Sequence, residues 1–246
     1  MLIALLSDIH ANREAYEACL ASATEAGATR VVVLGDIVGY GADPEWCVDR
    51  TRNLIANGAI CVRGNHDQAA SENIQSMTDN ARRAIEWTRN QLDTEARAFL
   101  GALPLSITED DRLYVHADAS APANWNYVQD ADDAKRHFKA SAARIGFCGH
   151  THRPALYSLS AAAKVTPFTP NSAEPIVLSS QRRWLATMGA VGQPRDGNPA
   201  AAYGLMDLTS NTLRFVRVPY DIHLAAEKIR NAGLPEALAA RLYRGK

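Results

Sequence analysis

Three polar side chains of different chemistry follow one another at Asn65, His66 and Asp67. They offer an amide oxygen, an imidazole and a carboxylate. Gly64 turns the chain just before them, and the apolar run 59–62 that precedes it is typical of a buried strand. One such cluster alone would be weak evidence of a functional site. Four other short apolar runs end in the same way, however, and this recurrence makes the pattern informative.

Histidine, aspartate and asparagine residues are concentrated at the ends of these five runs. Together they are Asp8, His10, Asp36, Asn65, His66, His116, His150 and His152. Five of the seven histidines of the chain lie there, which a random scatter would not produce. Imidazole and oxygen ligands without thiolates suit Mn, Fe, Zn, Co or Ni better than Ca or Mg. Apart from His66, seven ligands remain. They are too many for one tetrahedral zinc ion and fit two ions that share a bridging carboxylate.

The apolar runs are the expected strands that position these side chains. Residues 2–6, 31–34 and 59–62 alternate with two helical segments, which begin after the N-cap residues Asn12 and Asp43. This order predicts a parallel sheet with right-handed crossovers. In open α/β sheets ligands bind at the carboxyl ends of the strands, so the polar side chains should converge there.

Two further runs, 113–115 and 145–148, should deliver His116 and His150 in the same manner. Asp8 and His10 are two residues apart, and strand alternation would point both to the same side.

The remaining segments indicate how the sheet is completed. Residues 68–110 interrupt the rhythm with two helical patterns, which we interpret as a helical insertion that covers the sheet or rims the site. After His152, five strand-like runs lack crossover helices and predict antiparallel hairpins; they are 156–159, 176–178, 184–188, 202–208 and 213–218. Two helices follow, the first capped by Asp221. We expect one α/β domain over residues 1–246, with two packed sheets and helices outside.

Composition narrows the class of protein. Of the 246 residues, 47% are hydrophobic and 22% are charged, and 26 Lys and Arg balance 27 Asp and Glu. This balance argues against a dedicated nucleic-acid or membrane surface. The first apolar run, 2–6, is too short for a signal peptide or a membrane span. The four cysteines show no C-x-x-C spacing. We therefore expect free core thiols and a reducing cytoplasmic location.

The strand-end motifs resemble those of the calcineurin-like metallophosphoesterase superfamily. In family order they are D-x-H at Asp8 and His10, G-D at 35–36, G-N-H-D at 64–67, H at His116 and G-H-x-H at 149–152. The wider sequence, including G-Q-P-R-D at 192–196, is similar to the small prokaryotic phosphodiesterase branch. Two positions depart from it. Gly39 stands where many members have a second aspartate, and 187–189 read Thr-Met-Gly where many read Asn-Pro-Gly.

The resemblance implies a four-layer α/β/β/α sandwich of two mixed sheets flanked by helices, and it also implies two divalent transition-metal ions, Mn, Fe or Zn. One ion would be held by Asp8, His10 and His152, the other by Asn65, His116 and His150, with Asp36 as the bridge. Two ions, two carboxylates and a bridging hydroxide leave a charge of about +1, which attracts a phosphate ester. The hydroxide would attack phosphorus, and His66 would donate a proton to the leaving oxygen. Asp67 would orient His66.

Other residues have two open interpretations each. Arg63 precedes the tetrad, as an arginine that meets phosphate does in the protein-phosphatase branch, but a surface or supporting role is about equally compatible. Arg13, Arg153 and Arg195 are weaker candidates for substrate contact. Tyr40 either stacks on a base or packs in the core. His137 and His223 are assigned structural roles, and the apolar face of the C-terminal helix is either core or the interface of a homodimer.

The predicted activity is hydrolysis of a phosphodiester or a phosphomonoester, with a small phosphate ester or nucleotide as substrate. Diadenosine polyphosphates, cyclic nucleotides, other small diesters and phosphoproteins all remain open. A catalytically inactive scaffold of the same fold is the alternative from another class, but it should show eroded ligands, and here His66 and all seven ligands are present. The balanced charge disfavours a DNA nuclease.

Overall fold

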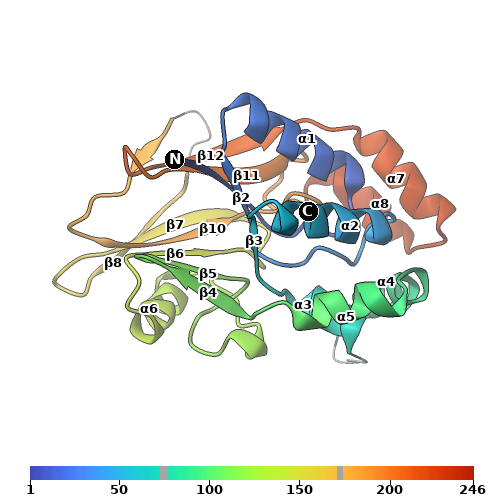
Figure 1. Ribbon diagram of the computed structural model, residues 1–246, viewed down its shortest axis with the longest axis horizontal. Helices are drawn as coiled ribbons and strands as arrows, with labels where there is room; N and C mark the ends of the chain where they lie inside the picture. Colours follow the sequence, from blue (N-terminus) through green and yellow to red (C-terminus); the bar gives the residue numbers. More distant parts are fainter. Residues whose placement is uncertain (73–76, 171–173) are drawn as a thin grey trace.

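The computed structural model describes residues 1–72, 77–170 and 174–246. Within these residues, two six-stranded mixed sheets pack face to face and helices cover their outer faces (Figure 1). This arrangement confirms the predicted α/β/β/α sandwich. That the whole chain is one domain stays a prediction.

The first sheet contains the predicted parallel unit at one side. Its order is β3-β2-β1-β11-β12-β9, in which β1, β2 and β3 are parallel and the other pairings are antiparallel. The strands are β1 (Leu2–Leu6), β2 (Arg30–Val33), β3 (Ile60–Cys61), β9 (Ile176–Val177), β11 (Ala201–Asp207) and β12 (Thr212–Val218). The crossovers are α1 (Arg13–Glu25) and α2 (Pro44–Ala56). The Asn12 side chain accepts the Ala15 N–H and so caps α1 as expected.

The second sheet has the order β4-β5-β6-β10-β7-β8. Its strands are β4 (Ser106–Glu109), β5 (Arg112–Val115), β6 (Ile145–Cys148), β7 (Pro154–Leu159), β8 (Val165–Phe168) and β10 (Arg183–Met188). We expected only antiparallel hairpins after His152, but β10 inserts between β6 and β7 and is parallel to β6. The sequence pattern did not predict β4 and β8. Both are edge strands with exposed or half-buried residues, so neither has the continuous apolar pattern of a central strand.

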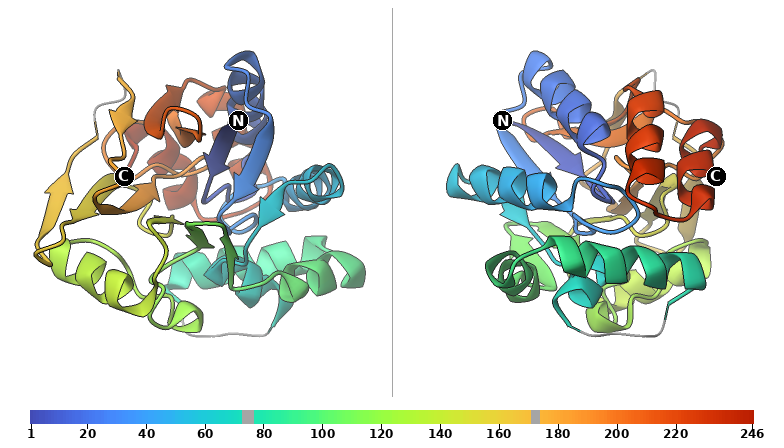
Figure 2. Two further views of the ribbon diagram at one scale, coloured as in Figure 1. Left: turned by 60° about the vertical axis from the view of Figure 1, so that its left-hand side comes forward. Right: turned by 90° about the vertical axis from the view of Figure 1, so that its right-hand side faces the viewer.

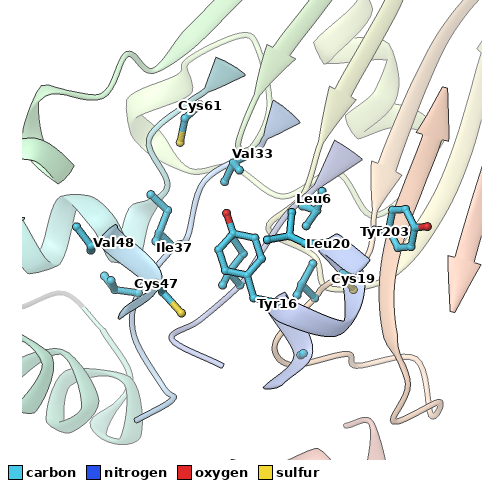
Figure 3. Close-up of a cluster of buried hydrophobic side chains, with 14 of the residues drawn as sticks. Leu6, Tyr16, Cys19, Leu20, Val33, Ile37, Cys47, Val48, Cys61 and Tyr203 are labelled. Carbon is cyan, nitrogen blue, oxygen red and sulfur yellow. The ribbon is translucent and has the colours of Figure 1, made fainter. Parts of the chain in front are cut away.

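Alternation along β1 shows how the first sheet separates two cores. Ile3 and Leu5 pack between the sheets, whereas Ala4 and Leu6 face the helices. Figure 3 shows the apolar cluster on the helix-covered face, in which Tyr16 from α1 lies over the ends of the strands. The four cysteine thiols are all buried, and Cys19, Cys47 and Cys61 belong to this cluster. Because both faces of the sheet are buried, the carboxyl ends of its strands are held firmly in place.

The remaining helices lie around and beyond the sheets. They are α3 (Asn65–Ser71), α4 (Asp79–Gln91), α5 (Thr94–Ala102), the 3-10 turn η1 (Pro122–Asn124), α6 (Ala131–Ala140), α7 (Ile222–Asn231) and α8 (Glu236–Arg244). Helix α6 covers the outer face of the second sheet, against β7, β8 and β10. Figure 2 shows α7 and α8 side by side, near α1. Leu238 and Leu242 of α8 belong to one buried apolar cluster that also includes Ala81 and Ala84 of α4, so this apolar face is buried within the chain itself.

Among the described residues, we find no helix with the length and apolar character that crossing a membrane requires.

Candidate metal centre

The eight strand-end residues predicted from the sequence converge where the carboxyl ends of the two sheets meet. Asp8 follows β1, Asp36 follows β2, Asn65 begins α3 after β3, His116 follows β5, and His150 follows β6. All of these side chains except Asn65 are buried. Their ligand atoms form three overlapping groups that could hold metal ions, and within each group these atoms lie within 4.8 Å of one another. The first group is Asp8, His10 and His152, the second is Asp36, His116 and His150, and the third is His10, Asp36 and His66.

The first group surrounds a carboxylate oxygen of Asp8. Its Oδ1 lies 3.3 Å from Nε2 of His152 and 3.8 Å from Nε2 of His10. The two Nε2 atoms are 3.1 Å apart. Three potential ligand atoms therefore point at one small volume, without a thiolate among them.

The second group is centred on His116. Its Nε2 lies 3.2 Å from Oδ1 of Asn65 and 3.2 Å from Nδ1 of His150. Asp36 joins the two groups, because its Oδ2 lies 3.4 Å from Nε2 of His116 and 3.6 Å from Nε2 of His10. One carboxylate oxygen is thus placed between an imidazole of each group.

Backbone carbonyls orient three of the imidazoles. Nδ1 of His10 is 3.1 Å from the Val38 carbonyl, Nδ1 of His116 is 2.7 Å from that of Leu34, and Nδ1 of His152 is 2.7 Å from that of Gln193. A carbonyl only accepts hydrogen bonds, so each Nδ1 carries a proton and each Nε2 is the ring atom that faces the centre. This pattern is typical of metal-binding histidines.

Two buried carboxylate oxygens test whether a metal fits. Oδ1 of Asp8 and Oδ2 of Asp36 are both buried, and neither has a hydrogen-bond partner in the described part of the chain. Leaving a buried carboxylate oxygen unpaired is costly. The same two atoms face the Nε2 atoms of the groups described above. Divalent cations would satisfy both kinds of atom at once, so the residues present fit a pair of metal ions.

The protonation of the centre is governed by burial and by Asp36. Burial holds the pKa of His10 and His152 well below the usual value and lowers the pKa of His150 to about 3, so these imidazoles are neutral at pH 7. Burial also raises the pKa of Asp8 to about 7. At His116 the effect of burial is outweighed by Asp36, and its pKa rises to about 9. A cation that binds here must therefore displace protons.

Unusual backbone geometry aims the ligands. Asp8, His10, Asp36, His150 and His152 all have left-handed backbone conformations, with φ between 51° and 64°. Non-glycine residues adopt this region rarely, and such strain clusters at functional sites. Our expectation that strand alternation aligns Asp8 and His10 was wrong. β1 ends at Leu6, and a left-handed turn, not the pleat, directs both side chains into the centre.

Close backbone approach explains the glycine of the tetrad. A Cβ on Gly64 would lie 2.1 Å from Oδ1 of Asp36. That oxygen accepts the His66 N–H at 2.8 Å, which fixes the carboxylate and leaves Oδ2 for the centre. Gly64 is therefore required by the geometry of Asp36.

His66 lies beside the ligands, with its ring centroid 4.8 Å from that of His10 and 4.4 Å from that of Tyr40. The Asp67 carboxylate does not orient it. Its oxygens accept the backbone N–H groups of Ile37, Val38 and Gly64, which ties two loops together. Within the described residues, Nδ1 of His66 has no hydrogen-bond partner. A Cβ on Gly39 would lie 2.4 Å from this atom, so the absence of a side chain at position 39 makes room for the ring.

Arg63 and Arg195 differ in their relation to the centre. Nη1 of Arg63 donates to the Gly101 carbonyl at 2.9 Å, and Arg63 is not among the residues that line the cavity over the metal centre. That cavity measures about 220 Å³ and is lined by Arg195 and Tyr127 as well as by predicted ligands. Arg195 also lies over the Tyr40 ring, 5.6 Å from its centroid. The sequence pattern gave Arg195 little weight and did not single out Tyr127.

The other two histidines lie outside the centre. His137 of α6 is buried and accepts the Ala119 N–H at Nδ1, and His223 of α7 pairs with the Tyr243 hydroxyl. Neither has a place in the metal groups formed by the described residues.

Two groups of histidine and carboxylate side chains, joined by one aspartate at the edge of a two-sheet sandwich, could hold metal ions. The profile of the calcineurin-like phosphoesterase superfamily domain matches residues 1–211. The chain belongs to this family and is a metal-dependent phosphoric ester hydrolase.

The chain is also similar to individual proteins and solved structures. The uncharacterized protein MJ0912 of Methanocaldococcus jannaschii is 35% identical over 253 residues, which cover 100% of this chain and 98% of that protein. A crystal structure of a metallophosphoesterase from Sphaerobacter thermophilus is 38% identical, with a TM-score of 0.89 over 100% of this chain and 99% of that one. The structure of the hypothetical protein PH1004 from Pyrococcus horikoshii OT3 aligns with a TM-score of 0.79 at 19% identity, over 100% of this chain and 98% of that one. This similarity is one of fold alone.

Proposed function

We propose that the chain hydrolyses a phosphodiester or phosphomonoester with Asp8, His10 and His152 as ligands of one divalent ion and Asn65, His116 and His150 as ligands of a second. Asp36 bridges the two. The position of Asp36 Oδ2, 3.4 Å from one histidine of the second group and 3.6 Å from one of the first, carries this proposal. Transition metals such as Mn, Fe or Zn, when bound, polarise the phosphoryl oxygens and supply a hydroxide nucleophile near neutral pH.

His66 is proposed as the proton donor to the leaving oxygen. It lines the cavity over the centre, next to the ligand Asn65. Burial lowers the pKa of His66 to about 4, so the ring is neutral before substrate binds. A phosphate anion beside the ring favours its protonated form and raises this pKa. Tyr40 packs against the ring and keeps it facing the cavity. The substrate contact predicted for Arg63 remains a prediction.

A panel of phosphate esters tests the proposal. Purified protein supplied with Mn²⁺ should hydrolyse p-nitrophenyl phosphate or bis(p-nitrophenyl) phosphate, and excess chelator should abolish this activity. If both esters are hydrolysed, the ratio of their kcat/KM values shows whether the enzyme prefers the monoester or the diester. Absence of hydrolysis throughout the panel, with metal bound, would instead support an inactive scaffold.

A further inference from the structure

A second hollow adjoins the cavity over the metal centre. It measures about 470 Å³, against about 220 Å³ for the first cavity. Tyr127 and Arg195 line both, so these two side chains form the wall that the hollows share. A phosphoryl group at the metal centre would therefore extend its ester substituent past Tyr127 and Arg195 into the second hollow.

The second hollow is lined by two cationic side chains. Arg153 and Arg195 are the charged residues among those that line it in the described structure. Nε of Arg153 donates to the Arg195 carbonyl at 2.9 Å, and Arg195 donates to the Gln193 side chain at 2.9 Å. Within residues 1–72, 77–170 and 174–246, neither guanidinium is paired with a carboxylate. Both therefore retain donors for an anion.

Two carboxylates that act on a residue of this hollow make other contacts. Asp130 and Asp133 act on Tyr157, whose pKa burial raises to about 12, but neither of them lines the hollow. Asp130 caps the start of α6, and Asp133 pairs with Arg136 at 2.9 Å. The charged side chains that line the hollow in the described structure are thus both cationic.

Tyr127 gives the passage between the hollows an aromatic wall. Its ring stacks on His150 with centroids 4.1 Å apart and an interplanar angle of 12°. The side chain is still 45% exposed, so one face remains available to a substrate. Along the chain, Tyr127 lies in the loop that joins η1 to α6.

We propose that the second hollow binds the leaving group of the substrate and that this leaving group bears a second phosphate, recognised by Arg153 and Arg195. This inference rests on the proposed phosphoester hydrolysis. In that reaction water oxygen forms a bond to phosphorus, the ester P–O bond breaks, and the leaving oxygen takes a proton. The preferred substrate class is thus a phosphate ester whose alcohol is itself phosphorylated.

Two nucleotides that differ in the second phosphate test the inference. The Mn²⁺-loaded protein should hydrolyse adenosine 3′,5′-bisphosphate with a kcat/KM about 10- to 100-fold above that for adenosine 5′-monophosphate, the range expected of charge-assisted hydrogen bonds. Arg153→Gln should remove most of this preference, mainly through KM. Because p-nitrophenyl phosphate carries no second phosphate, Arg153→Gln should reduce its hydrolysis far less than that of adenosine 3′,5′-bisphosphate.

Arg214→Gln is the matched control, because Arg214 is an exposed arginine on β12 that does not line either hollow. It should keep the full preference. If p-nitrophenyl phosphate is hydrolysed but wild type shows no preference, or Arg153→Gln and Arg214→Gln keep the same preference, the leaving-group site is wrong and the proposed function stands. If none of the three substrates is hydrolysed, both proposals fail.

Discussion

Asp36 is the residue on which both groups of the metal centre depend. Its Oδ1 is fixed by the His66 N–H, and its Oδ2 has no partner among the described residues except the facing imidazoles of His10 and His116. His116 and other nearby histidines outweigh the effect of burial and hold the pKa of Asp36 well below its usual value. The carboxylate is therefore ionised at neutral pH and ready to bind cations.

Replacement of the bridge should cost more than loss of a ligand from one group. Asp36→Asn removes one of two carboxylates and affects both ions, so kcat/KM should fall by more than the 10- to 100-fold typical of supporting residues in metal sites. His116→Ala and His152→Ala each affect one ion and should retain part of the metal. Turnover and metal content of the three variants provide the comparison. Equal and mild losses in all three would contradict a bridging role.

Replacement of His66 should depend on the leaving group. General acid catalysis contributes about 10²- to 10⁴-fold, and only when the departing oxygen needs a proton. His66→Ala should therefore lose far more activity on an alkyl phosphate than on a p-nitrophenyl ester, while metal content stays at the wild-type level. The measurement is the kcat/KM of wild type and His66→Ala on both substrates. An equal loss on the two would assign His66 to binding of the phosphoryl oxygens instead. Loss of metal would assign it to the ligands, which its proximity to His10 and Asp36 permits.

Sequence reasoning could find the strand-end residues because parallel strands bring their carboxyl ends together. It gave little weight to Arg195 and missed Tyr127, although both line the cavity over the metal centre. Arg195 is placed by a backbone hydrogen bond from its N–H to the His152 carbonyl, between segments far apart along the chain. Tyr127 is placed by stacking on His150. Such contacts depend on tertiary packing, and no local pattern announces them. The same holds for the left-handed turns at Asp8 and His10.

At the scale of elements, the predicted helices and strands match the structure where a local pattern of capping or burial marks them. Helix starts at Asn12 and Asp221 could be predicted because each side chain caps its own helix. The edge strands β4 and β8 could not, because their residues are not buried as a continuous run. The position of β10 beside β6 was also missed, since register between distant strands depends on the packing of the whole sheet.

Helix α6 contains a histidine that should make stability depend on pH. Burial lowers the pKa of His137 from 6.5 to about 4. The unfolded chain binds a proton below pH 6.5 whereas the folded chain does not, so stability is full above pH 6.5 and falls as the pH approaches 4. The shift corresponds to a loss of up to about 3 kcal/mol. His137→Gln removes the titrating ring and should show a smaller loss.

Denaturant unfolding at pH 7.5 and pH 4.5 measures this effect in wild type, His137→Gln and the control His223→Gln, an exposed histidine of α7. The control should retain the wild-type pH dependence. If His137→Gln retains it as well, His137 is not the source of the acid sensitivity.

At the scale of the molecule, two sheets buried on both faces support a centre built from loops. The candidate ligands follow β1, β2 and β3 of one sheet and β5 and β6 of the other, so they come together only when the sheets pack against each other. The α7–α8 face, which the sequence left open as core or dimer interface, packs against α4 within the same chain. A homodimer stays a prediction, as does a cytoplasmic location.

Metal titration tests the central claim most directly. Protein freed of metal with a chelator is titrated with Mn²⁺, while bound ions per chain and hydrolysis of a phosphate ester are measured on the same samples. We predict that binding saturates at about two ions per chain and that full activity requires both. Full activity in chelator, or saturation of binding and activity at one ion, would contradict a centre in which Asp36 joins two metal sites.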